Sequence, residues 1–146
     1  IRIASGERLS HNQDDIKVNA CAIEARINAE DPDNNFLPSP GKITNYIVPG
    51  GPGIRVDSHA YAGYDVPPYY DSLLGKLIAY GKNRQDTIRI MQRALGEYVV
   101  EPIKTTIPFH KEVFHNPQFI RGQVSTGFVE SVLGEAELRR VRRRQS

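Results

Sequence analysis

Apolar and polar residues alternate between residues 16 and 30, and this period predicts a β-strand with one buried and one wet face. The apolar positions are Ile23, Ala25, Ile27 and Ala29. On the polar face, Arg26 stands between Glu24 and Asn28. This face is either an ordinary solvated surface or one wall of a site.

More strands are predicted downstream. The segment 42–58 is predicted to form a hairpin around the turn PGGPG at 49–53, because glycine readily adopts the positive φ angles of such turns. The apolar, glycine-bounded run LLGKLIAYG at 73–81 predicts a buried strand. The loop between these strands is expected to be pinned by aromatic burial, while stacking on bases is the alternative. Its aromatic residues are Tyr61, Tyr64, Tyr69 and Tyr70.

Helices are predicted in the second half of the chain. Asn83 is a candidate N-cap for the clearest of them, and Thr106 is expected to cap another that has Pro108 in its first turn. A shorter helix is expected over 128–132. Because strands come first and helices later, the order favours an α+β fold, with C-terminal helices packed on an antiparallel sheet. The apolar positions of the clearest helix are Ile88, Met91, Leu95 and Tyr98.

The composition fits one domain, with 146 residues of which 39% are hydrophobic. No apolar run approaches the roughly 18 residues of a membrane helix. We expect a domain over 1–134 and a disordered basic tail over 135–146. Five arginines lie within 139–146, so the net charge of +2 becomes −3 without them, which argues against nucleic-acid binding by the fold itself. The single cysteine, Cys21, fits a reducing, cytoplasmic compartment.

Common catalytic motifs are missing from the sequence. The turn PGGPG lacks the Lys-Ser/Thr pair of a phosphate-binding loop, and no GxSxG motif occurs. His110 and His115 are five residues apart, which is not the spacing of zinc-binding helices, so no metal site is expected. Arg26 has a chemical interpretation, because the rigid fork of arginine suits an oxyanion and a strand would hold it in place. A solvated strand face is the simpler alternative.

The chain also contains several longer blocks in a fixed order: IEARINAED, FLPSPGKI, PGGPGIRVDS, AGYDVPPYYDSLLGKLIAYG and IKTTIPFH. Together they resemble the C-terminal domain of biotin carboxylase, over about residues 1–134. The resemblance implies an ATP-grasp enzyme that uses MgATP and bicarbonate to carboxylate the ureido nitrogen of carrier-bound biotin. Such enzymes serve acetyl-CoA, propionyl-CoA and pyruvate carboxylases.

The resemblance implies roles for individual residues. Arg26 matches the family's arginine that contacts bicarbonate and biotin and stabilises the enolate-like oxygen of deprotonated biotin. Thr126 and Gly127 match positions at the edge of the ATP pocket, where the bacterial acetyl-CoA carboxylase pattern has Ile and His. Pro52 and Arg55 match the family's dimer interface. In the family, an aromatic residue often stands at the position of Pro52.

Partners are implied as well: the rest of the biotin carboxylase chain, the biotin carboxyl carrier protein, a second copy in a homodimer, and a carboxyltransferase subunit. The family's ATP lid, Mg-binding glutamates and general base are expected upstream, so this chain is expected to be inactive alone. Two alternatives stay open. The domain could be a non-catalytic assembly or dimerisation module, or the arginine tail could bind nucleic acid, with an affinity that falls steeply with salt.

Overall fold

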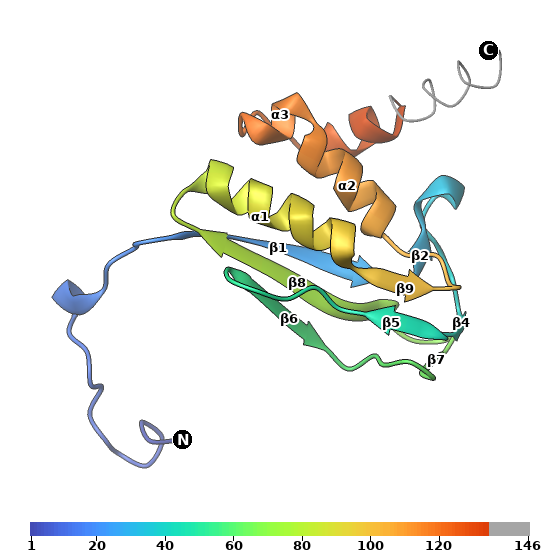
Figure 1. Cartoon of the computed structure of the whole chain (residues 1–146). Helices are drawn as coiled ribbons and strands as arrows, with labels where there is room; N and C mark the ends of the chain where they lie inside the picture. Colours follow the sequence, from blue (N-terminus) through green and yellow to red (C-terminus); the bar gives the residue numbers. More distant parts are fainter. Residues whose placement is uncertain (135–146) are drawn as a thin grey trace.

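The computed structural model describes residues 1–134, and a three-stranded antiparallel sheet lies at the centre of this part (Figure 1). β8 (Leu73–Gly81) lies between β1 (Cys21–Asn28) and β6 (Ile54–Ser58). Short antiparallel pairs accompany this sheet: β2 (Glu30–Asp31) with β3 (Leu37–Pro38), β4 (Gly41–Lys42) with β7 (Asp65–Val66), and β5 (Asn45–Ile47) with β9 (Val99–Glu101).

Helices cover one face of the sheet. α1 (Arg84–Glu97) packs on β8 and β1, α2 (Ile107–His115) packs on α1, and α3 (Pro117–Ile120) packs on α2 (Figure 1). The predicted α+β class and the antiparallel sheet are therefore confirmed. The remaining helical pieces are η1 (Gln13–Asp15), η2 (Pro32–Asn34) and the stretch 128–134. The expected basic tail, 135–146, lies outside the described residues.

The main core lies between the sheet and α1, where both elements present their apolar faces. Ile27 and Leu77 from the sheet, and Met91 and Leu95 from α1, are 0% exposed. Burying an aliphatic side chain of this size contributes about 1.5–3 kcal/mol, so these residues are central to stability. The helix positions expected to be apolar and inward-facing are confirmed, including Tyr98 just after the last turn.

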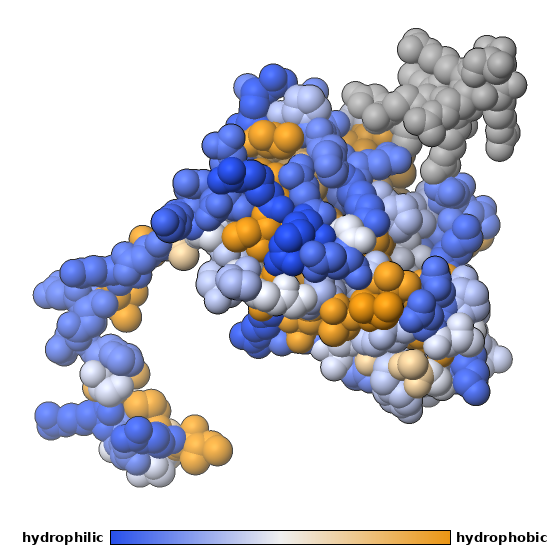
Figure 2. All heavy atoms as spheres, in the orientation of Figure 1, coloured by the Kyte–Doolittle hydropathy of each residue, from blue (hydrophilic) through white to orange (hydrophobic). Residues whose placement is uncertain are grey.

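The alternation in the first strand is confirmed, but the strand is shorter than the predicted 16–30. β1 begins at Cys21, which pairs with Gly81, the last residue of β8. Because the chain then turns into α1, residues before Cys21 have no neighbouring strand to pair with. Residues 1–20 are exposed and extend away from the body of the molecule as an arm (Figure 1 and Figure 2).

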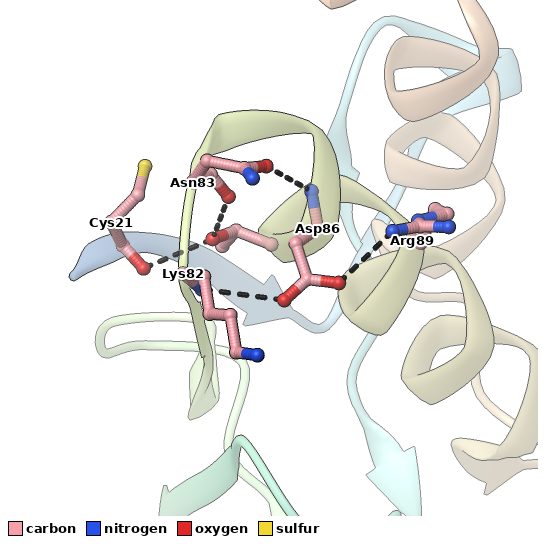
Figure 3. A network of polar contacts seen from close by, with 6 residues as sticks. Cys21, Lys82, Asn83, Asp86 and Arg89 are labelled. Carbon is pink, nitrogen blue, oxygen red and sulfur yellow. Dashed lines mark hydrogen bonds and ion pairs between the residues drawn. The ribbon is translucent and has the colours of Figure 1, made fainter.

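Polar contacts join the start of α1 to the start of β1 (Figure 3). As predicted, Asn83 caps the helix: its side-chain oxygen accepts from the backbone N–H of Asp86 at 2.9 Å. The fully buried Thr87 Oγ1 lies 3.0 Å from the carbonyl oxygen of Cys21 and 2.9 Å from that of Asn83. An ion pair of 3.1 Å joins Asp86 to Arg89. These contacts fix where the helix begins relative to the sheet.

Replacing Asn83 with alanine is expected to lower the free energy of unfolding by about 1 kcal/mol, because one backbone N–H of the first turn loses its acceptor. Urea unfolding followed by circular dichroism measures this loss. Asn19→Ala is the matched control, since Asn19 is exposed in the N-terminal arm. Equal stability of the two variants would contradict the capping role.

The predicted hairpin at 42–58 is wrong, although its glycine turn is confirmed. Gly51 and Gly53 have φ angles of +92° and +77°. However, β5 pairs with β9 and β6 pairs with β8, so the two strands beside the turn do not pair with each other. The backbone N–H of Tyr80 in β8 donates to the carbonyl oxygen of Gly53 at 2.9 Å. A Cβ on Gly53 would lie 2.6 Å from the Tyr80 carbonyl oxygen, so glycine allows β6 to join β8 here.

Aromatic burial holds the loop between β6 and β8 less than predicted. Tyr64 packs against the core, whereas Tyr61, Tyr69 and Tyr70 are 60%, 88% and 83% exposed. The expectation of burial is therefore wrong for three of the four side chains, because the loop lies at the surface beyond the sheet. The short helix expected over 128–132 is confirmed.

Candidate functional site

Arg26 lies on the open face of the three-stranded sheet, opposite the face that α1 covers. Lys76 of β8 is its direct cross-strand partner, and Asp57 of β6 is the next residue in the same row. The Arg26 side chain is 65% exposed, and its Nε lies 4.0 Å from Oε1 of Glu24. An ion pair at this distance and exposure is weak, so the guanidinium is available to an external anion.

The residues that follow Arg26 on β1 are tied to the loop before β8. Asn28 donates from its side-chain amide to Oε1 of Glu30 at 3.0 Å. The Ser72 hydroxyl donates to the same carboxylate oxygen. On the polar face of β1, Arg26 is therefore exposed, whereas Asn28 is partly buried and hydrogen-bonded to Glu30. This end of the face is held by side-chain hydrogen bonds, unlike a plain solvated surface.

The outer edge of β1 meets the beginning of α2 instead of another strand. The Thr106 hydroxyl lies 3.0 Å from both the Arg26 carbonyl oxygen and the Asn28 backbone nitrogen. The backbone N–H of Thr106 donates to the Asn28 carbonyl oxygen, also at 3.0 Å. Thr106 occupies the N-cap position of α2, but its side chain does not cap the helix. The predicted capping role is therefore wrong, since the hydroxyl binds the edge of β1.

His110 contributes a further contact to this edge. Its Nε2 lies 2.8 Å from the Arg26 carbonyl oxygen. Burial lowers the pKa of the His110 imidazole below its usual range, and the hydrogen bond to the carbonyl opposes this effect without reversing it. A carbonyl oxygen can only accept, so the neutral ring carries its proton on Nε2 and donates it to Arg26.

The interface residues inferred from the resemblance lie across the sheet from Arg26, on the opposite edge strand β6 and in the turn before it. Arg55 of β6 forms two contacts of 2.8 Å with the carboxylate of Asp57, and Pro52 is exposed in the preceding turn. The hydrogen bond from Arg55 holds the pKa of Asp57 below its usual range. This pair therefore persists above the usual pKa of the carboxyl and is lost as the pH falls through its lowered value.

Thr126 and Gly127 lie away from Arg26. They form an exposed turn after α3, directly before the helical stretch at 128–134. That stretch packs against α2 through Phe128 and Val132, which form a small cluster with Val113. Arg26 lies on the far surface of the sheet, so the structure does not bring these candidate residues together.

Three residues near Arg26 were missed by sequence reasoning in the roles that they have here: Lys76, Thr106 and His110. Only Lys76 gave a local signal, since it is the one charged residue in the otherwise apolar run 73–81. Within residues 1–134, no group of three or more His, Cys, Asp or Glu side chains is arranged to hold a metal ion. In the same part of the chain, no helix has the length and apolar character needed to cross a membrane.

The fold and site define an α+β domain whose antiparallel sheet presents a backbone-anchored arginine on its open face. The family model for the biotin carboxylase C-terminal domain matches residues 24–131, which include Arg26, Arg55, Thr126 and Gly127. The chain therefore belongs to the biotin carboxylase C-terminal domain family.

Named relatives agree with this assignment. The chain is 54% identical over 132 residues to a biotin carboxylase of Nostoc sp., a match that covers 90% of the chain and 30% of that protein. It is 53% identical over 131 residues to biotin carboxylase 1 of Bacillus subtilis, covering 90% of the chain and 29% of that protein. The chain thus spans about 30% of the length of these curated relatives.

A solved structure supports the fold. The biotin carboxylase domain of the 2-oxoglutarate carboxylase from Hydrogenobacter thermophilus, a dimer in complex with MgADP, ADP and bicarbonate, superposes with a TM-score of 0.87. The two chains are 44% identical, and the match covers 90% of this chain and 30% of that one.

Proposed function

We propose that this chain is the C-terminal domain of a biotin carboxylase and supplies one wall of the site where the ureido nitrogen of carrier-bound biotin is carboxylated. The observation that carries the proposal is Arg26, whose guanidinium is exposed and whose carbonyl oxygen accepts from Thr106 and His110 at the outer edge of β1. Relatives of the same family support it, since one of them has been solved with MgADP and bicarbonate.

Arg26 would stabilise negative charge in this reaction. When the ureido nitrogen of biotin loses its proton, charge moves onto the ureido oxygen, and a guanidinium aimed at that oxygen lowers the barrier because it is positioned beforehand. The planar fork of arginine also suits the two oxygens of bicarbonate. The nearby Lys76 adds a second positive charge to the same row of the sheet.

MgATP would activate bicarbonate for this carboxylation. In our proposal, segments outside this chain hold the metal and the phosphates. Thr126 and Gly127 would form one edge of the adenine pocket, where an exposed turn could meet the nucleotide. Alone, the domain would neither bind MgATP well nor turn over.

The test of the proposed function uses the full-length protein that contains this chain. Bicarbonate-dependent ATP hydrolysis is measured with and without free biotin. We expect biotin to stimulate hydrolysis and to become carboxylated. ATP hydrolysis that does not respond to biotin would indicate a different ATP-grasp ligase and would overturn the proposal.

We also propose that the full-length enzyme is a cytoplasmic homodimer that works with a carrier protein and a carboxyltransferase, and that Pro52 and Arg55 lie at its dimer interface. The Hydrogenobacter relative, which is described as a dimer, supports this. Arg55→Glu is expected to shift the enzyme from dimer to monomer, because it places a second negative charge beside Asp57. Light scattering after size-exclusion chromatography measures the mass.

The charge-matched control is Arg121→Glu, since Arg121 is exposed at the end of α3. It should leave the mass unchanged. If Arg55→Glu stays dimeric as well, the interface lies elsewhere. A monomeric Arg55→Glu enzyme that keeps full carboxylation activity would show that dimerisation is not needed for catalysis. If the domain served assembly alone, replacing Arg26 would leave carboxylation unchanged.

A further inference from the structure

Arg26 owes its direction to its backbone more than to its side-chain neighbours. Within residues 1–134, Glu24 supplies the one acidic group within 4.0 Å of the guanidinium, and that contact lies at the 4.0 Å limit. The side chain is 65% exposed, so packing does not confine it. The backbone of β1 at this residue therefore sets the direction in which the Arg26 side chain leaves the strand.

β1 lies at the edge of its sheet, where strands are held on one side only. At Arg26 this weakness is removed by two donors that reach the same carbonyl oxygen. The Thr106 hydroxyl lies 3.0 Å from it and the His110 Nε2 lies 2.8 Å from it. A carbonyl oxygen has two lone pairs, so both donors can bind at once.

The two donors have different tasks. Thr106 also binds the backbone of Asn28, so it joins α2 to β1 over two residues and is part of the fold itself. His110 lies one turn further along α2, and the hydrogen bond of its ring to β1 is made with Arg26 alone. Burial lowers the pKa of its ring and so favours the neutral form, in which the contact is an N–H donation that brings no extra positive charge to the site.

From this geometry we propose that His110 is a positioning residue for catalysis, whose Nε2–H fixes the backbone of Arg26 and thereby aims the guanidinium at the reacting oxyanion. This inference rests on the proposed biotin carboxylase function. A displacement of about 1 Å at a catalytic group can cost about 100-fold in rate, so a contact that only orients Arg26 is sufficient to affect turnover.

The test compares two amides in the full-length enzyme. In His110→Gln the side-chain nitrogen takes a place close to that of Nε2 and can still donate to Arg26. In His110→Asn the amide is one carbon shorter and ends near the position of Nδ1, so it cannot reach. We expect the Gln variant to keep turnover within about threefold of the unsubstituted enzyme, and the Asn variant to lose about tenfold or more in kcat at unchanged KM for ATP.

A double-substitution cycle separates positioning from general destabilisation. If His110 acts through Arg26, His110→Asn should lower the residual turnover of an Arg26→Ala enzyme by less than twofold. A full further loss in that background, or equal activity of the Gln and Asn variants, would overturn the inference while the proposed function stands. If the unsubstituted full-length protein does not carboxylate biotin, both the proposed function and this inference fall.

Discussion

Replacing Arg26 with alanine in the full-length enzyme is expected to lower the turnover of biotin carboxylation by about 100- to 1000-fold, the usual effect of removing one oxyanion-stabilising donor. The residue is 65% exposed and packs little, so the fold should tolerate the change. The loss should therefore appear in kcat with little change in the unfolding midpoint. Fixation of labelled bicarbonate into biotin measures it.

Arg26→Lys separates the effect of charge from that of geometry. It keeps the positive charge but loses the planar fork, so a turnover between those of the unsubstituted enzyme and Arg26→Ala is expected if bidentate binding of an oxyanion contributes. The KM for ATP should change little in either variant, because the nucleotide is proposed to bind elsewhere. Near-normal turnover of the alanine variant would remove Arg26 from the mechanism and leave the solvated strand face as the better interpretation.

Replacing Leu77 with alanine is expected to lower the free energy of unfolding by about 2–5 kcal/mol. Leu77 is 0% exposed and lies on the central strand β8, between Ala25 of β1 and Val56 of β6. Truncation leaves a cavity beneath α1 that the rigid sheet cannot close. Urea unfolding of this chain measures the effect.

Leu9→Ala provides the control for this variant. Leu9 is 70% exposed in the N-terminal arm, so the same chemical truncation should change stability by less than about 0.5 kcal/mol. If both leucine variants lose the same stability, the core does not lie between the sheet and α1.

Local patterns predicted the elements that depend on local forces. The run 73–81 is β8 with the predicted bounds, because it is apolar, glycine-bounded and buried. The Asn83 cap and the apolar spacing behind it gave α1, since the cap and the buried face are both set within a few turns of one helix. The polar face of β1 likewise placed Arg26 at the surface.

Contacts between distant segments could not be predicted in this way. The predicted hairpin is wrong because the chain after Gly53 forms β6, which pairs with residues of β8 that lie between 17 positions (Ser58 with Gly75) and 25 positions (Ile54 with Ala79) further along the chain. Thr106 and His110 are 80 and 84 residues away from Arg26, so no local spacing links them. A threonine before a helix favours a cap on local grounds, and only the fold shows that its hydroxyl binds β1 instead.

The central claim, that Arg26 faces the reacting groups of biotin carboxylation, is tested most directly by a crystal structure of the full-length enzyme with bicarbonate and biotin bound. We expect a guanidinium nitrogen of Arg26 at about 3 Å from the biotin ureido oxygen, with bicarbonate in contact with the same side chain. An Arg26 guanidinium turned towards solvent, with both ligands bound elsewhere, would contradict it.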